Sequence, residues 1–198
     1  SIGSFLIKFY NNKFESKIND KLIDKFFIWS VLGIIIGGRA GYVLFYQLEI
    51  FLSNPIYLFL IWKGGMSFHG GLLGIIISIY FFSKKNNIHF FYLADLVSLV
   101  APIGLFLGRL ANFINVELFG RVTDFPLAII YPSIDNQPRH PSQLYEAFLE
   151  GIVLFFILQI IFTKNYSNKI YGYISSLFLL FYGLFRFFIE FLREPDEH

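Results

Sequence analysis

The 198-residue sequence contains no cysteine, four histidines and few charged residues, which make up 15% of the chain. Without cysteine the chain cannot form a disulfide, attack through a thiolate or bind a metal through sulfur. The histidines are not clustered with other metal ligands, so we expect neither a metal nor another cofactor. Ser67 and Ser142 lack partners for a catalytic triad, which argues against an acyl-enzyme hydrolase. The net charge is only +2, and most lysines lie in loops, so nucleic acid is not an expected partner.

Apolar side chains dominate the sequence. Hydrophobic residues make up 56% of the chain and aromatic residues 21%, and the mean hydropathy is +0.60. This composition predicts an all-α polytopic membrane protein, with one integral-membrane domain over residues 1–198. Residues 2–10 are too few to span a bilayer and are expected to form a partial N-terminal helix. The five strong transmembrane segments, of which the second is short for a span of about 20 residues, are 26–46, 69–83, 90–112, 143–163 and 171–192.

The lysines predict which side of the membrane each loop faces. They concentrate in the loops at 13–25, 84–85 and 164–169, and the positive-inside rule places these loops in the cytoplasm. The segment 113–142 carries four prolines and is expected to form a small extracytoplasmic head, with a short strand from Leu127 to Tyr131. A shorter stretch, 55–62, is expected to be interfacial or re-entrant.

Glycines spaced four residues apart predict close approach of helices, because a helix without Cβ atoms on one face can pack backbone against backbone. Such spacing occurs within three of the predicted spans. The glycines concerned are Gly33, Gly37 and Gly41, Gly70 and Gly74, and Gly104 and Gly108.

Three arginines interrupt or end apolar runs. A guanidinium within a span costs roughly 2.5–3.5 kcal/mol on insertion scales, so Arg39, Arg109 and Arg186 should each face a partner, a cavity or an anionic ligand. At about 1.5 Å per helical residue, Arg39 and Arg186 lie about 20 Å or more from the cytoplasmic starts of their helices. His69 also begins at the outer end of its helix. Polar groups from five segments are therefore expected near one level.

Purely structural roles for these polar residues remain open. Gln143, Glu146 and Glu150 share one helical face, but they would also suit an acidic first turn that the helix dipole stabilises. Arg186 and Glu190 are spaced to form an ion pair within one helix. His69 alone is more typical of a packing residue. Asp95, near the cytoplasmic end of its span, suggests a helix-start or snorkelling role.

Two further polar patterns stand out, one on the last span and one at the end of the span 90–112. On the last span Tyr182, Arg186, Glu190 and Arg193 form a polar stripe that should face the bundle. The run Gly108–Arg121, GRLANFINVELFGR, places an arginine beside amides and a carboxylate at a membrane interface, a mixture that suits a phospholipid headgroup. We expect Arg109 and Arg186 to reach one cavity, because two buried guanidiniums otherwise lack a sufficient anionic partner.

This run closely resembles the signature of the bacterial prolipoprotein diacylglyceryl transferases. Other stretches resemble the family in the same order: GGRAGYVLFY (37–46), GGMSFHGG (64–71), RHPSQLYEAFLEG (139–151) and GLFRFFIEFLREPD (183–196). The resemblance implies transfer of the diacylglyceryl group of phosphatidylglycerol to the lipobox cysteine of a prolipoprotein. The reaction would release glycerol 1-phosphate at the outer leaflet of the bacterial plasma (inner) membrane. The resemblance also implies that the chain is truncated at both ends relative to typical members.

The resemblance assigns roles to particular residues. Arg109 and Arg186 match the phosphate-handling arginines, and His69 matches a histidine that acts as a base or orients the substrate. These three are the candidate catalytic residues, with no metal ligand among them. The candidate substrate-binding residues are Arg39, Arg109, Asn112, Asn115, Glu117, Gly120, His140, Gln143, Glu146, Tyr182, Glu190 and Arg193. An anion transporter is the main alternative, but no internal repeat is evident and the polar residues crowd one side rather than the midplane. A lipid-binding scaffold without catalysis is a third interpretation.

Overall fold

The computed structural model describes residues 2–13, 18–165 and 170–195, and it divides into two compact units, Ser1–Ala94 and Asp95–His198. Parts of two predicted cytoplasmic loops, including Lys17 and Lys169, lie outside the described residues. Within the described ranges most residues are helical, as expected of an all-α membrane protein. The prediction of a single domain is not tested by this division and stays a prediction.

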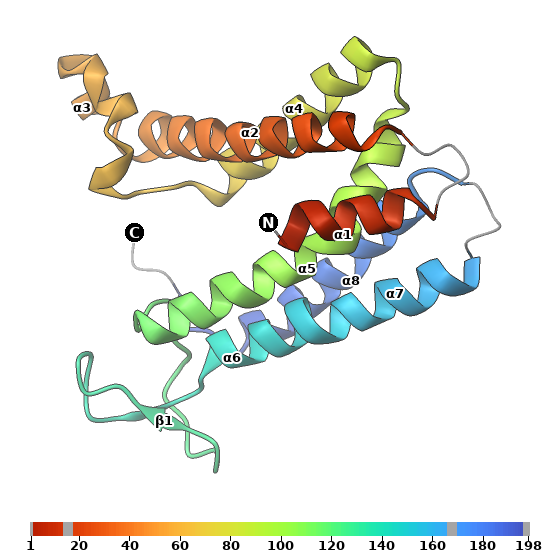
Figure 1. The fold of residues 1–198 in the computed structure, drawn as a ribbon. Helices are drawn as coiled ribbons and strands as arrows, with labels where there is room; N and C mark the ends of the chain where they lie inside the picture. Colours follow the sequence, from red (N-terminus) through yellow and green to blue (C-terminus); the bar gives the residue numbers. More distant parts are fainter. Residues whose placement is uncertain (1, 14–17, 166–169, 196–198) are drawn as a thin grey trace. The chain divides into compact units, whose positions relative to one another are not determined.

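The first unit is built around two helices that lie side by side (Figure 1). Asn19 caps the first of them, its side chain accepting a hydrogen bond from the Lys21 amide at 2.8 Å. Ser67 caps the second by accepting from the Gly70 amide at 3.2 Å. The elements in chain order are α1 (Ile2–Asn11), α2 (Asp20–Tyr46), α3 (Leu48–Ser53), η1 (Pro55–Phe59), η2 (Ile61–Lys63) and α4 (Phe68–Asn86), followed by the start of α5 (Phe90–Ile114).

Glycines allow α2 and α4 to pack closely, as their spacing predicts. A Cβ atom built on Gly41 would lie 2.8 Å from the Gly70 Cα, and one on Gly70 would lie 2.9 Å from the Gly41 Cα. Gly37 and Gly74 are equally crowded. The same prediction is wrong for Gly104 and Gly108, because a Cβ at either position would meet no described atom within 4 Å.

Four helical segments are long and apolar enough to cross a membrane, namely Asp20–Tyr46, Phe90–Ile114, Ser142–Lys164 and Tyr173–Glu190, counted over the described residues. Their outward side chains include large exposed apolar groups such as Phe45 and Phe156, which suits a lipid environment. The chain is therefore a multi-pass membrane protein. The remaining predicted span, 69–83, forms α4, which is not among these four segments. Five spans thus remain a prediction.

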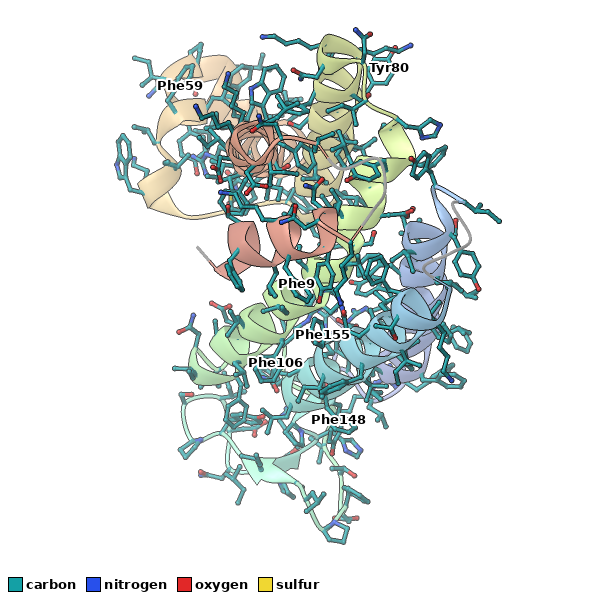
Figure 2. All side chains as sticks on the ribbon, turned by 45° about the vertical axis from the view of Figure 1, so that its right-hand side comes forward. Phe9, Phe59, Tyr80, Phe106, Phe148 and Phe155 are labelled. Atoms are coloured by element: carbon teal, nitrogen blue, oxygen red, sulfur yellow. The ribbon has the colours of Figure 1, made fainter. Side chains whose placement is uncertain are left out.

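The second unit contains most of α5 and the elements after it. Between α5 and the next helix, the strand β1 (Ile129–Ile130) pairs antiparallel with β2 (Pro138–Arg139). The predicted strand is correctly placed but shorter than expected. The helical segment that follows is continuous and consists of α6 (Ser142–Glu146), a π-helical turn η3 (Ala147–Val153) and α7 (Leu154–Asn165). The last helix is α8 (Tyr173–Glu190). Phe106 and Phe155 lie between α5 and α7 (Figure 2), where they line a small apolar cavity.

Asp95, which lies in the first turns of α5, caps the start of α8. Its two carboxylate oxygens accept from the backbone amides of Gly172 and Ser175, each at 2.8 Å. Asp95 is 2% exposed, and an anion at a helix N-terminus is favourable because unpaired amides and the helix dipole meet there. The expected helix-start role is therefore confirmed, but for a helix whose N-cap residue, Gly172, lies 77 residues later in the chain.

Candidate functional site

Two arginines and three glutamates from three segments form one cluster in the second unit. Arg109 on α5 lies 3.1 Å from Glu146 Oε2 through its Nε atom and 3.2 Å from Glu150 Oε2 through Nη2. Arg186 on α8 donates to the other oxygen of Glu146 and, at 2.7 Å, to Glu190. Glu146 thus joins the two guanidiniums. We call these five residues the arginine–glutamate cluster.

Burial differs strongly among the carboxylates of the cluster. The side chains of Glu146 and Glu150 are fully buried, those of Arg109 and Arg186 are 15% and 24% exposed, and that of Glu190 is 58% exposed. Buried charges persist only where they are paired and hydrogen-bonded. The buried glutamates therefore anchor the arginines within the spans, whereas Glu190 can exchange with another anion at low cost.

Two oxygen atoms in the cluster have unused acceptor capacity. Glu146 Oε2 lies within ion-pair distance of Arg109 but accepts no hydrogen bond from any described residue, and Glu150 Oε1 likewise accepts none. Buried carboxylate oxygens usually have donors, so each would suit a hydroxyl donor if binding opened the cluster. The cluster thus offers guanidinium donors and carboxylate acceptors side by side. No group of three described His, Cys, Asp or Glu side chains is arranged to hold a metal ion.

The signature run continues from Arg109 into a tightly bonded loop. Asn112 donates to Glu117 Oε2 at 2.9 Å, and the Glu117 carbonyl accepts from Gln143 at 2.7 Å. Val116 and Leu118 have φ angles of 57° and 54°, a left-handed conformation that side chains other than glycine rarely adopt. Such strain persists only where surrounding contacts fix the backbone, as the hydrogen bonds to this loop do.

Gly120 lies where the head meets the end of α8. Its amide donates to the His140 carbonyl at 2.9 Å, and the next amide, of Arg121, donates to the Leu192 carbonyl at 3.0 Å. A Cβ atom on Gly120 would come within 2.7 Å of the Leu192 carbonyl oxygen. This close backbone crossing explains why glycine occupies the position. It also ties the signature loop to the helix that carries Arg186.

Ion pairs and an aromatic contact hold the head together beyond this crossing. Arg139 donates to Asp135 at 2.7 Å and to Glu194 at 3.4 Å, and its guanidinium lies 5.0 Å from the Phe119 ring centre. The hydrogen bonds from Arg139 hold the pKa of Asp135 below its ordinary value. His140 shares a hydrogen bond of 3.3 Å with the Tyr145 hydroxyl. These contacts give Arg139 partners within the head and after α8, and they give His140 a partner on α6.

The structure brings together several of the candidate residues. Arg109 and Arg186 converge as expected, because both contact Glu146, whereas the expected cavity between them stays a prediction. The reason given for the convergence is wrong, since buried carboxylates already supply their anionic partners. The expected intrahelical pair of Arg186 and Glu190 also forms, alongside the contact to Glu146 rather than in place of it.

Other candidates lie beside or apart from the cluster. Tyr182 stacks on Phe178, with ring centres 5.9 Å apart, and the Arg193 carbonyl accepts from Arg121 at 2.8 Å. Asn115 is exposed. Arg39 and His69 belong to the first unit, where His69 is exposed on α4 and Arg39 is buried.

Glu150 is the cluster member missing from the candidate site residues. Its spacing of four residues from Glu146 was the available signal, because residues so spaced face the same way on a helix. The sequence pattern alone also fitted a solvated acidic turn. Only the contact with Arg109, on another helix, distinguishes the two.

Comparison with known proteins identifies close relatives. A family model described as "Prolipoprotein diacylglyceryl transferase" matches residues 2–198. Three similar proteins are each named phosphatidylglycerol–prolipoprotein diacylglyceryl transferase. The protein from Aeromonas hydrophila subsp. hydrophila is 57% identical, and the match covers 85% of this chain and 61% of the relative. The protein from Rickettsia felis is 51% identical, and the match covers 98% of this chain and 77% of the relative. The protein from Pseudoalteromonas atlantica is 56% identical, and the match covers 90% of this chain and 62% of the relative. The chain thus spans about three fifths of the length of two of these relatives.

Proposed function

The chain belongs to the prolipoprotein diacylglyceryl transferase family, and on that premise we propose that it transfers a diacylglyceryl group from phosphatidylglycerol to the lipobox cysteine of a prolipoprotein. This is the first step of bacterial lipoprotein maturation. The proposed setting is the bacterial inner membrane, with the site towards the outer leaflet. Membrane-spanning helices and the names of the relatives support a lipid donor.

The reaction exchanges one bond for another at a glycerol carbon. The cysteine sulfur of the prolipoprotein forms a thioether bond to the terminal carbon of the diacylglyceryl group, and the bond from that carbon to the phosphate oxygen breaks. The phosphate leaves as glycerol 1-phosphate, carrying the bonding electron pair. The thiol proton is lost to a base, for which we propose His69, because a neutral imidazole nitrogen can accept a proton. No nucleophilic side chain of the enzyme is required.

The observation that carries this proposal is the arginine–glutamate cluster. Arg109 and Arg186 are held at one carboxylate, so their remaining donors can grip one phosphate group. An incoming phosphate would replace the exposed Glu190 on Arg186, because a surface carboxylate is the cheapest anion to displace. Two positioned guanidiniums would then stabilise the charge that develops on the leaving phosphate.

The unused oxygens of Glu146 and Glu150 support a glycerol headgroup in particular. The headgroup of phosphatidylglycerol carries two hydroxyl groups, each of which can donate a hydrogen bond to a carboxylate. A choline headgroup has no such donor. Asn112, Glu117 and Gln143, linked in the neighbouring loop, are the further residues that we propose to contact the headgroup.

Mass spectrometry of the reaction tests the proposal. Purified protein is incubated with phosphatidylglycerol and a lipobox peptide, and the peptide is expected to gain one diacylglyceryl group. Phosphatidylcholine as donor and a peptide with serine in place of cysteine are the matched controls, and neither should react. A peptide that stays unmodified with phosphatidylglycerol, under conditions where an active family member modifies it, would refute the proposal.

A further inference from the structure

Arg39 is almost fully buried, at 3% exposure, within the candidate span α2. Its guanidinium donates to four backbone carbonyls of the segment that follows α2. Nε donates to Leu58 at 3.2 Å, Nη2 to Tyr57 at 2.8 Å, and Nη1 to Gly64 at 2.5 Å and Gly65 at 3.3 Å. The Arg39 Cζ atom also lies over the Tyr57 ring, 4.8 Å from its centre. Its donors are therefore directed at neutral backbone oxygens rather than at an anion.

The segment from Leu48 to Met66 has little regular structure. It contains the six-residue helix α3 and the short 3-10 helices η1 and η2. Gly64 and Gly65 both have positive φ angles, 76° and 83°, which turn the chain back towards α2. Carbonyls in such a segment lack the bonding that a continuous helix would provide, and each needs a donor if it lies at membrane depth.

The position of Arg39 along α2 indicates, from helix length, that these carbonyls lie near a membrane boundary. α2 has 27 residues, or about 40 Å at 1.5 Å per residue, which exceeds the hydrocarbon thickness of about 30 Å. Arg39 is seven residues from the end of α2 at Tyr46, so it lies about 10 Å from that end. Its guanidinium is thus within about one side-chain length of the hydrocarbon boundary, where arginine side chains usually point.

The outer surface of the segment is apolar and aromatic. Eight large apolar side chains on it are between 43% and 76% exposed: Leu48, Ile50, Leu52, Ile56, Phe59, Ile61, Trp62 and Met66. Phe59 is labelled on this segment in Figure 2. The segment follows directly from a span, and tryptophan is typical of the membrane–water interface.

We propose that residues 48–66 form a membrane-interface flap, bound to lipid at the boundary where α2 ends, and that Arg39 is the residue that positions it. The partner is the lipid bilayer itself. The guanidinium supplies donors to the Leu58, Gly64 and Gly65 carbonyls and a second donor to the Tyr57 carbonyl, which also accepts from the Leu60 amide. The flap can therefore enter the interface while its side chains contact lipid. This role gives Arg39 a function other than substrate binding, and it does not depend on the proposed transfer reaction.

The two native tryptophans provide the test. In the Trp29→Phe variant Trp62 is the only tryptophan, so its fluorescence reports the flap, and the protein is placed in vesicles that contain brominated phospholipids. We expect bromine near the headgroup end of the acyl chains to quench Trp62 more than bromine near their methyl ends. Aqueous iodide should quench it less than free tryptophan. Trp62 quenched freely by iodide and not by brominated lipid would overturn the flap.

Substitution of Arg39 tests separately whether this residue positions the flap. In the Trp29→Phe protein, a second substitution, Arg39→Gln, removes most of the hydrogen-bond donors to the flap carbonyls. We expect iodide quenching of Trp62 to rise at least about twofold in this variant. Arg39→Lys should give an intermediate rise. The matched control is Trp62→Phe with the same Arg39 changes, in which Trp29 on α2 should keep its lipid quenching. Unchanged Trp62 quenching in both Arg39 variants, or an equal change at Trp29, would overturn the positioning role.

Discussion

Arg109 is the residue at which charge and geometry can be separated. Lysine keeps the positive charge but lacks the planar fork that can hold two oxygens. Arg109→Lys should lower diacylglyceryl transfer at saturating lipid by at least about tenfold, or about 1.4 kcal/mol of transition-state stabilisation. The exposed Lys164→Arg change should leave turnover intact. Turnover near that of the parent protein, with unchanged lipid affinity, would show that Arg109 acts only through its charge.

The glutamates of the cluster should differ in their contribution to stability. Glu146→Gln removes the buried carboxylate shared by both arginines, and we expect a loss of about 3 kcal/mol in the free energy of unfolding. Glu190→Gln changes an exposed partner of Arg186 and should cost less than about 1 kcal/mol. Denaturant unfolding in detergent, followed by far-UV circular dichroism, measures both. Equal losses would mean that Glu146 is not the link between the arginines.

At the scale of whole elements, Asp95 fixes the start of α8. Asp95→Ala leaves the amides of Gly172 and Ser175 without their acceptor, and we expect it to cost about 1–3 kcal/mol. Asp124→Ala, at an exposed position in the head, should change stability little.

The same substitution should move α8 relative to α5. Because the chain has no cysteine, spin labels attach only at introduced positions, such as Leu107→Cys on α5 and Phe187→Cys on α8. The distance between these labels should shift or broaden in Asp95→Ala and not in Asp124→Ala. An unchanged distance would limit Asp95 to local capping.

The sequence predicts elements better than it predicts the contacts between them. Hydrophobic runs located α2, α5, the segment 142–165 and α8, because a span must be apolar and about 20 residues long. They did not predict that Glu146 would join Arg186, 40 residues away, since spacing determines which side chains share a face of one helix but not which helix that face meets. Arg39 shows the same limit, because no local pattern indicates that a loop will supply its acceptors.

At the scale of the whole molecule, the lysine pattern makes a prediction about sidedness. The loop at Lys84 and Lys85 should be cytoplasmic and the head at 113–142 outside. In intact spheroplasts, a membrane-impermeant maleimide should label Leu127→Cys, whereas Lys85→Cys should react only after permeabilisation. Both positions are exposed, so accessibility within the protein does not limit labelling. The reverse labelling would place the candidate site on the cytoplasmic side.

The π-helical turn η3 has a consequence for chain length. A π turn closes hydrogen bonds five residues apart, so it holds about one residue more than the α-helical turn it replaces. Removing one residue from 147–153 would therefore restore an uninterrupted α-helix while Glu146 and α7 keep nearly the same relative facing, because the wide turn had absorbed the extra residue. A deletion within the regular α-helix of α7 has no such slack and would rotate the residues beyond it by about 100°. Removal of one residue should therefore be tolerated within η3 and damaging within α7.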